Sequence, residues 1–333
     1  MFTAQSPLAD RDRDDGQAYR ERRAVRAGGG AGRPAPLPAP LPATLAGRIR
    51  FEVRVTIRLL ADNSSAAVVP PVLFTAAVGL RQGLAAADLA RHVAAAAVLF
   101  LLFLYVFDTA NQAAGAAEDA LNKPYRPIPS GLITREGVLT RLSIALPLYT
   151  LAGLLTETIG WVLLWQTVSL GLNLLSNPRH YVVVKPVAMV LGTLAQLAAA
   201  WELVTPLDGE GWRWVLVVTA ACNLPMCFED VRDMAGDRRI GRRTLPLMLG
   251  HWPVRIWFAL NMAALPATLH VLLFSHGHAG QAVVLGCDAL VAVPAWTAGA
   301  RSLLRREARA DRVTYLLFTG IYAVILSCAF ALL

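Results

Sequence analysis

The run HVAAAAVLFLLFLYVFDTANQAAGAAEDALNKPYRPIPSG, residues 92–131, joins an apolar segment to a group of charged residues. The apolar part, 92–109, is long enough to cross a bilayer as a helix, which requires roughly 17–25 mostly apolar residues. Three carboxylates and two basic residues lie at its end: Asp108, Glu118, Asp119, Lys123 and Arg126. Because ionisable residues near hydrocarbon are costly, those that persist there are generally functional. This junction is therefore the first candidate for a site.

A second acidic group lies at the end of a later apolar stretch, in FEDVRDMAGDRRIGRRTLP, residues 228–246. Asp230, Asp233 and Asp237 have the spacing i, i+3, i+7, which places them on one face of a helix, with Glu229 beside them. Like charges on one face repel, and a hard cation with oxygen ligands would neutralise them. Mg²⁺ is typically shared between protein carboxylates and substrate phosphates. Since basic residues follow both groups, the pattern predicts a metal–diphosphate site; the alternative is a solvated helix end with unrelated acids.

The composition indicates a membrane protein. Of 333 residues, 56% are hydrophobic and 16% are charged, whereas a soluble domain has about 25% charged residues. The net charge of +8 does not indicate nucleic-acid binding, because the basic residues alternate with apolar runs and form no continuous face. All four cysteines lie in apolar stretches, so we interpret them as small buried hydrophobic residues and predict neither disulfides nor zinc.

The apolar stretches predict an all-α integral membrane bundle of about nine transmembrane helices, with the two Asp-rich groups in loops on one side. The candidate spans are 62–80, 92–109, 138–156, 158–176, 186–204, 212–228, 254–273, 280–298 and 313–332. Asn173, Gln196 and Asn223, inside the spans, are expected to form interhelical hydrogen bonds.

Basic residues predict the orientation. With the N-terminus in the cytoplasm, the cytoplasmic loops and their flanks hold 17 Lys and Arg residues, and the opposite loops hold three. Both acidic groups then face the cytoplasm. Residues 1–47 have mixed charge, then glycines and prolines, without the apolar core of a signal peptide. We predict a disordered cytoplasmic tail over 1–47 and a membrane domain over 48–333. The Ala, Arg and Gly bias favours a bacterial cell membrane.

Two smaller elements lie near the acidic groups. Arg126 is held among prolines in a short turn, where a guanidinium is well suited to bidentate phosphate contacts; the alternative is an ordinary topology-setting residue. Tyr181 and Lys185, at spacing i, i+4, share a face at the start of a span. Taken alone, this pair is typical of an interfacial aromatic with a snorkelling lysine.

Over about residues 50–332 the chain resembles the UbiA superfamily of intramembrane prenyltransferases. The first motif of that family, Asn-x-x-x-Asp-x-x-x-Asp, matches at both ends. The second motif, Asp-x-x-x-Asp, and a Tyr-x-x-x-Lys element match throughout. The matching residues are Asn111 and Asp119, Asp233 and Asp237, and Tyr181 and Lys185.

The resemblance implies a nine-helix bundle in which two Mg²⁺ ions bind a prenyl diphosphate, and an allylic carbocation forms in an apolar cavity that excludes water. It implies that Glu118, Asp119, Asp230, Asp233 and Asp237 are the Mg²⁺ ligands and that Asn111 is an auxiliary ligand or substrate contact. Lys123, Arg126 and Lys185 would hold the diphosphate, with help from Tyr181.

The chain departs from the first motif at its middle position, where Gly115 replaces aspartate. The pattern NQ-x₅-ED-x-x-NKP-x-RP-x-x-SG resembles the terpene cyclase branch of the superfamily. We therefore expect Mg²⁺-dependent ionisation of a prenyl diphosphate, farnesyl or geranylgeranyl, followed by cyclisation within the molecule. The alternative is transfer of the prenyl group to an aromatic or other acceptor. A more distant alternative is a carrier, but carriers place ionisable residues near the bilayer midplane and these acids lie at span ends.

Overall fold

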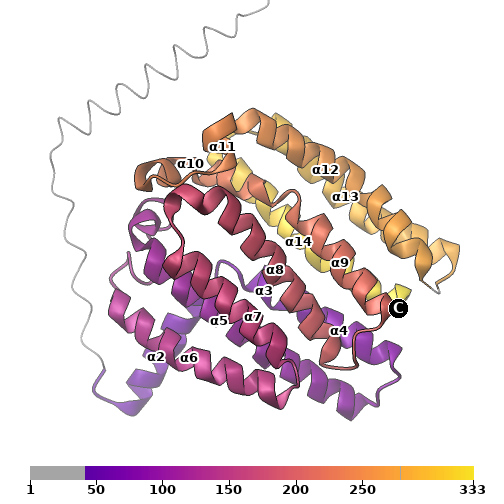
Figure 1. Cartoon of the computed structure of the whole chain (residues 1–333), viewed down its shortest axis with the longest axis horizontal. Coiled ribbons are helices and arrows are strands. Elements are labelled where there is room, and N and C mark those ends of the chain that lie inside the picture. The colour runs from indigo at the N-terminus through magenta and orange to yellow at the C-terminus, as the bar shows by residue number, and fades with distance from the viewer. Residues whose placement is uncertain (1–41, 278) are drawn as a thin grey trace, which may run out of the picture. The chain divides into compact units, whose positions relative to one another are not determined.

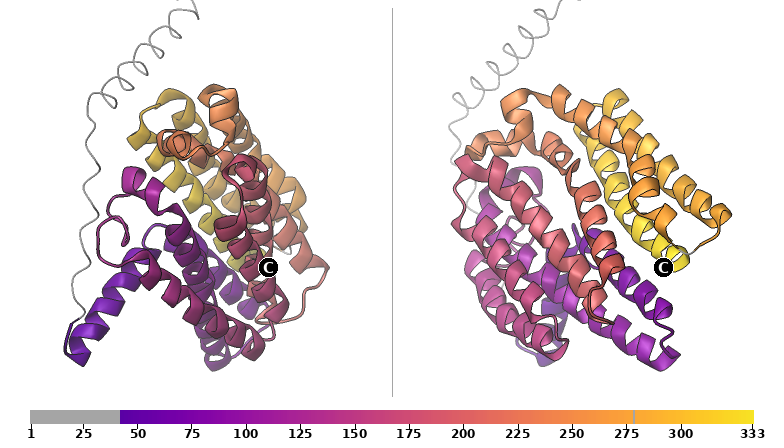
Figure 2. Two further views of the ribbon diagram at one scale, coloured as in Figure 1. Left: turned by 60° about the vertical axis from the view of Figure 1, so that its left-hand side comes forward. Right: turned by 45° about the vertical axis from the view of Figure 1, so that its right-hand side comes forward.

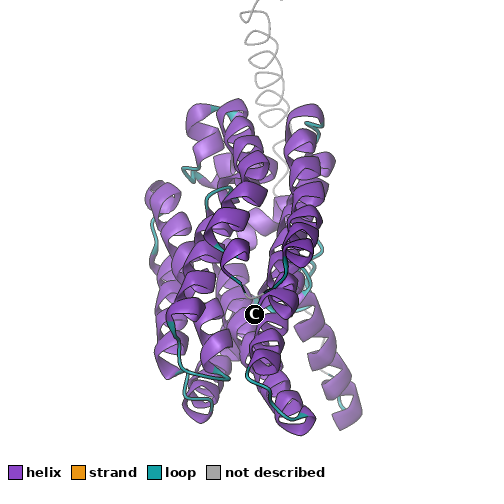
Figure 3. Ribbon diagram, turned by 90° about the vertical axis from the view of Figure 1, so that its right-hand side faces the viewer, coloured by secondary structure: helices purple, strands orange, loops and turns teal. Residues whose placement is uncertain are grey.

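A computed structural model describes residues 42–277 and 279–333, and in these residues the regular structure is entirely helical (Figures 1 and 3). Most of the predicted 1–47 tail lies outside the described residues. Helix α2 begins at Leu45, after a Thr44 cap that accepts from the Gly47 N–H, so residues 45–47 are helical. The principal helices are α2 (Leu45–Leu60), α3 (Ser64–Ala67), α4 (Val69–Arg81), α5 (Ala86–Asn122), α6 (Arg135–Leu155), α7 (Ile159–Leu170), α8 (Tyr181–Glu202), α9 (Gly209–Asn223), α10 (Glu229–Ile240), α11 (Leu245–Leu249), α12 (His251–Leu272), α13 (Gln281–Leu304) and α14 (Ala308–Leu332).

The helices confirm the predicted all-α membrane bundle. Within the described residues, eight helical segments are long and apolar enough to cross a membrane, and Ile159–Leu175 is a shorter apolar helix. Together they correspond to the nine predicted spans, and the chain is a multi-pass integral membrane protein. One part of the prediction is wrong: the two acidic groups lie on helices and not in loops. The first belongs to α5, which continues past 109 to Asn122, and the second lies on α10.

Local chemistry explains where these two helices end. Lys123, which follows α5, has φ −140° and precedes Pro124, and a residue before proline is disfavoured in the helical region. Gly241 ends α10 in the left-handed region at φ 74°, a conformation that glycine adopts without penalty. Each acidic helix is therefore followed at once by a turn that carries basic residues.

Helices α4, α5, α7, α8, α9 and α14 contact one another in succession and close into a ring, because α14 returns to α4. Helix α6 packs outside α5 and α7, and α12 and α13 lie side by side outside α9 and α14 (Figure 2). Large aromatic residues fill the core between these elements. The Phe74 ring lies 5.7 Å from both the Trp201 and the Trp214 ring.

A buried ion pair ties the outer helices together. The Arg255 guanidinium, on α12, donates to both carboxylate oxygens of Asp311, on α14, at 2.7 and 2.6 Å. It also donates to the Ser302 carbonyl of α13 at 2.7 Å, and the side chains of Arg255 and Asp311 are almost fully buried.

Replacing Asp311 by alanine should destabilise the fold, because it leaves the buried Arg255 guanidinium without its carboxylate. Removing one partner of a buried ion pair costs about 3–5 kcal/mol, which corresponds to a fall of roughly 10 °C in the thermal unfolding midpoint. The control is Asp88→Ala, whose carboxylate pairs with Arg91 on an exposed surface and should matter little. An unchanged midpoint for Asp311→Ala would contradict this account.

Candidate active site

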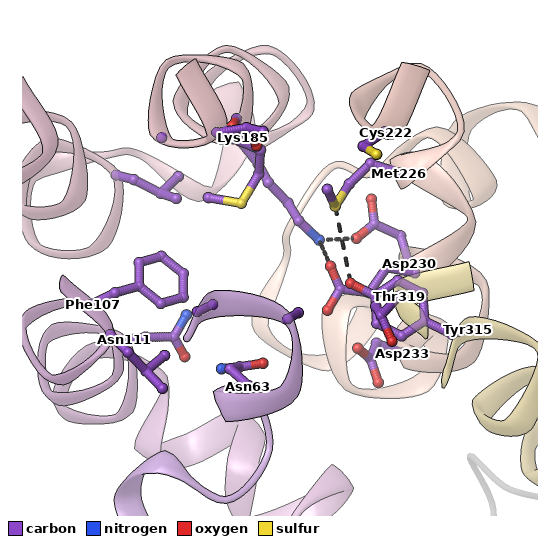
Figure 4. Close-up of a pocket in the computed structure, with 18 of the residues that line it drawn as sticks. Asn63, Phe107, Asn111, Lys185, Cys222, Met226, Asp230, Asp233, Tyr315 and Thr319 are labelled. Carbon is purple, nitrogen blue, oxygen red and sulfur yellow. Dashed lines mark hydrogen bonds and ion pairs between the residues drawn. The ribbon is translucent and has the colours of Figure 1, made fainter. Parts of the chain in front are cut away.

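A cavity of about 210 Å³, more than ten times the space that one water needs, lies among these helices. Its lining includes every predicted site residue: Asn111, Glu118, Asp119, Lys123, Arg126, Tyr181, Lys185, Asp230, Asp233 and Asp237. Figure 4 shows Asn63, Phe107 and Asn111 across the cavity from Asp230, Asp233 and Tyr315. The two acidic groups, more than a hundred residues apart in the sequence, thus line one cavity. The role of each residue stays a prediction.

Arg126 organises the first motif. Its Nη1 donates to both carboxylate oxygens of Asp119 at 3.0 Å, and its Nε donates to Asp62 Oδ2 at 2.9 Å. The Arg126 side chain is 3% exposed, so these two carboxylates neutralise a buried cation. The Asn111 side-chain amide donates to Asn173 Oδ1 at 3.2 Å. Asn173 lies in a short π-helix, Gly171–Leu175. The contact confirms the predicted interhelical role of Asn173.

Lys185 has the same function in the second motif. Its ammonium lies 2.5 Å from Asp230 Oδ1 and 3.1 Å from Glu229 Oε2 (Figure 4). Arg232 also pairs with this group, 2.9 Å from Glu229 and 3.3 Å from Asp233. The Lys185 charge therefore faces two carboxylates of α10, and its role in a functional site stays a prediction.

Arg242 joins the two motifs. It forms an ion pair with Glu118 of α5, lies 3.4 Å from Asp237 of α10, and has its guanidinium 4.4 Å from the centre of the Tyr181 ring. Burial alone would lower the pKa of Arg242, but Tyr181, Glu118 and Asp237 outweigh burial and raise it. The left-handed turn at Gly241 directs the chain back toward α10, so that the Arg242 N–H donates to the Asp237 carbonyl at 3.0 Å.

A glycine allows the two acidic helices to approach closely. A Cβ added at Gly236 would lie 2.2 Å from the Asn122 amide nitrogen, at the end of α5. Any larger residue would push α10 away from α5 unless the Asn122 side chain moved. The sequence pattern alone does not reveal this constraint, because Gly236 has an ordinary helical conformation.

The other end of the cavity is apolar and aromatic. The Trp165 indole stacks on Phe103, with centroids 4.3 Å apart and planes 6° apart, and lies 5.4 Å from the Phe107 ring. A Cβ at Gly192 would lie 2.2 Å from the indole, so α8 leaves room for Trp165 only because this residue is glycine. Trp165 Nε1 donates to the Phe103 carbonyl at 3.0 Å, which fixes the orientation of the ring.

Polar residues within the spans form the interhelical hydrogen bonds that were predicted for them. Gln196 donates to the Ala67 carbonyl and accepts from the Tyr322 hydroxyl, both at 2.8 Å. Asn223 donates to Thr193 Oγ1 at 3.0 Å. Gln196 and Tyr322 also line the cavity, so they add polar groups to its largely apolar end.

Three residues that contribute to this site are not predicted from the sequence: Asp62, Asn63 and Arg242. Glu229 belongs to the predicted second acidic group, although it is not among the predicted Mg²⁺ ligands. Asp62 and Asn63 lie at the start of the predicted span 62–80, and a charged residue at the end of an apolar stretch is a signal that could have identified Asp62. Arg242 was counted for its charge, and its contact with Glu118 depends on the fold.

The acidic residues are paired with cations. In the described part of the chain, no three His, Cys, Asp or Glu side chains converge in an arrangement that could itself hold a metal ion. Of the described residues that line the cavity, six are carboxylates and four are basic. The polar end is therefore net negative while it also holds cations.

Residues 68–321, which make up most of the chain, match the UbiA prenyltransferase family. The chain belongs to this family. Somaliensene A/B synthase of Streptomyces somaliensis is 34% identical over 269 residues, which cover 78% of this chain and 86% of the relative. Diterpene cyclase eriG of Hericium erinaceus is 34% identical, over 80% of this chain and 84% of the relative. Polyprenyl transferase eriF of the same fungus is 32% identical, over 79% and 88%.

The fold is also that of solved UbiA structures. A UbiA homolog from Archaeoglobus fulgidus, bound to GPP and Mg²⁺, aligns with a TM-score of 0.55 at 14% identity. The alignment covers 81% of this chain and 99% of that one. At this identity the likeness shows a common fold, and it agrees with the family assignment made from sequence.

Replacing Asp62 by asparagine should destabilise the protein in a pH-dependent way. Burial alone would raise the pKa of Asp62, but Arg126 and hydrogen bonds from Tyr125 and Arg126 outweigh burial and lower it. A carboxylate with a lowered pKa stabilises the fold above its unfolded pKa of about 3.9, and this contribution is lost as the pH falls through the folded value.

The thermal unfolding midpoints of wild type and Asp62→Asn should therefore differ between pH 5 and 8 and converge progressively below about pH 4. Asp88→Asn, which removes a carboxylate from an exposed ion pair, is the control and should show a smaller difference. A difference for Asp62→Asn that stays constant down to the lowest pH at which the protein remains folded would overturn the assignment.

Proposed function

We propose that this chain ionises an allylic prenyl diphosphate, farnesyl or geranylgeranyl, with Mg²⁺ and then cyclises the prenyl group to a terpene. The observation that carries the proposal is a single cavity with a charged end and an aromatic end. Along α8, about 16 Å of helix rise separates Lys185 at the charged end from Gln196 in the apolar part. An amphiphilic substrate with an anionic head and a hydrocarbon chain fits such a cavity.

The donor set fits Mg²⁺. With six carboxylates and four basic side chains among the described lining residues, a diphosphate would add negative charge to an already negative site. Divalent cations would restore the balance. Because no three acids of the described residues converge, each ion would take remaining ligands from water and phosphate oxygens, as Mg²⁺ commonly does. We assign Glu118, Asp119, Asp230, Asp233 and Asp237 as its ligands, and bound Mg²⁺ would stabilise the charge of the departing diphosphate.

The basic residues are held where the diphosphate would lie. Arg126 and Lys185 form ion pairs with Asp119 and Asp230, so each cation is already positioned by a carboxylate. If those carboxylates held Mg²⁺, the Arg126 guanidinium and the Lys185 ammonium would be free to bind phosphate oxygens, with Lys123 beside them. Tyr181 supports Arg242 through its ring, and Asn111 provides an auxiliary ligand or substrate contact.

The aromatic end would bind the prenyl chain and exclude water from the cation. Phe103, Phe107 and Trp165 form a rigid stacked wall, and such rings stabilise positive charge over their faces. Cyclisation is supported by the terpene cyclase pattern around Asp119 and by the synthase and cyclase relatives. Transfer to an acceptor is the alternative, supported by the polyprenyl transferase relative.

We propose further that the charged end of the cavity and the N-terminus face the cytoplasm of a bacterial cell. The 17 basic residues that flank one side of the predicted spans, against three on the other, support this orientation. A substrate made in the cytoplasm would then reach the diphosphate end directly, while its chain enters the membrane domain.

Replacing Asp233 by asparagine should reduce diphosphate release about 100-fold or more, because the loss of a charged group at the leaving-group end removes several kcal/mol of transition-state stabilisation. The fold should survive this change. Among the described residues, the Asp233 carboxylate forms an ion pair only with the adjacent Arg232. Release of diphosphate from geranylgeranyl diphosphate measures the effect, and Asp88→Asn is the matched control. Normal turnover in Asp233→Asn would show that the assignment of Asp233 as a Mg²⁺ ligand is wrong.

Cyclisation and transfer can be separated by the product. Purified protein with Mg²⁺ and a prenyl diphosphate of ten, fifteen or twenty carbons, with no acceptor, should form a hydrocarbon or terpene alcohol. Hexane extraction and gas chromatography–mass spectrometry would detect it, with Asp233→Asn as the blank. If product forms only after aromatic or lipid acceptors are added, the protein is a transferase and the cyclase assignment is wrong.

A further inference from the structure

Two rows of side chains recur every fourth residue along α2, one aliphatic and one basic. They are Ile49, Val53 and Ile57, and Arg50, Arg54 and Arg58. A shallow groove lies between the rows and is lined by these six side chains. An apolar surface and a cationic surface therefore run parallel along one helix.

The aliphatic row has no cover in the described structure. Ile49, Val53 and Ile57 are 56%, 52% and 62% exposed. On the opposite side of α2, Val55 and Leu59 are fully buried, in a cluster with residues of α5 and α6. Helix α2 is thus fixed to the bundle by one side and presents the groove on the other. It is not among the described helices that are apolar enough to cross a membrane.

Contacts place α2 at the level of the acidic motifs. Gln112 of α5 donates to the Leu59 carbonyl at 2.8 Å, and Arg58 donates to Ser130 Oγ at 3.4 Å, in the turn that carries Arg126. Figure 2 shows α2, in indigo, at one edge of the bundle. Because the acids lie at the ends of the apolar spans, these contacts place the C-terminal end of α2 at the same end of the bundle.

We infer that this groove binds an anionic phospholipid, with the phosphate on the arginine row and an acyl chain on the aliphatic row. Guanidinium groups match phosphate oxygens in geometry and charge. Amphipathic helices with this composition lie in the interface and respond to anionic lipid. Arg50 and Arg54 are exposed, and neither forms a hydrogen bond or ion pair with another described residue.

The test measures binding at α2 and does not depend on catalysis. The full chain is reconstituted into phosphatidylcholine vesicles with and without phosphatidylglycerol, and amide hydrogen exchange of peptides covering 45–60 is followed by mass spectrometry. Wild type should exchange severalfold more slowly in the vesicles that contain phosphatidylglycerol, and high salt should abolish the difference. The double variant Arg50→Gln/Arg54→Gln should exchange equally in both vesicles.

A matched double variant, Arg305→Gln/Arg309→Gln, removes two exposed basic residues from the junction of α13 and α14 and should keep the wild-type difference. Unchanged exchange of the membrane spans in all variants shows that the fold is intact. Equal exchange of wild-type α2 in both vesicles would refute the phosphate site. Slowing that persists in Arg50→Gln/Arg54→Gln would also refute it, because the arginine row would then have no part in binding.

Discussion

Charge neutralisation at the end of a membrane bundle is the constraint on which this structure depends. The described residues that line the cavity include six carboxylates, and each has a basic partner: Glu118 and Asp237 with Arg242, Asp119 with Arg126, Glu229 and Asp230 with Lys185, and Asp233 with Arg232. An unpaired carboxylate in such a place would be costly. The pairing keeps the site folded without ligand and positions cations that an anionic substrate can use.

The same pairs connect segments that are distant in the chain. Arg242, in the turn after α10, pairs with Glu118 of α5. Arg126, in the turn after α5, pairs with Asp62, which lies between α2 and α3. Small residues make the approach feasible: Gly236 lets α10 contact Asn122, and Gly192 makes room for Trp165. The charged and aromatic ends of the cavity are therefore held by packing that no single motif encodes.

Periodicity was sufficient to predict most of the architecture. Long apolar stretches predicted the spans, and helical spacing placed Asp230, Asp233 and Asp237 on one face, as α10 confirms. The apolar span predicted over 92–109 is only part of α5, which continues to Asn122, because the polar residues after 109 end the hydropathy signal without ending the helix. The pairing of Arg242 with Glu118 could not be predicted, since it depends on the turn at Gly241 and on how α10 meets α5.

The sequence by itself determined the membrane class, the number of apolar helices and the two acidic motifs, because hydrophobicity and helical period are local properties. It also identified ten residues that prove to line one cavity. Only the tertiary structure decided which acid faces which base, that Asp62 belongs to the site, and that Phe103, Phe107 and Trp165 form its apolar wall. These relations join residues far apart in the chain, and they are set by packing between helices rather than by spacing within one.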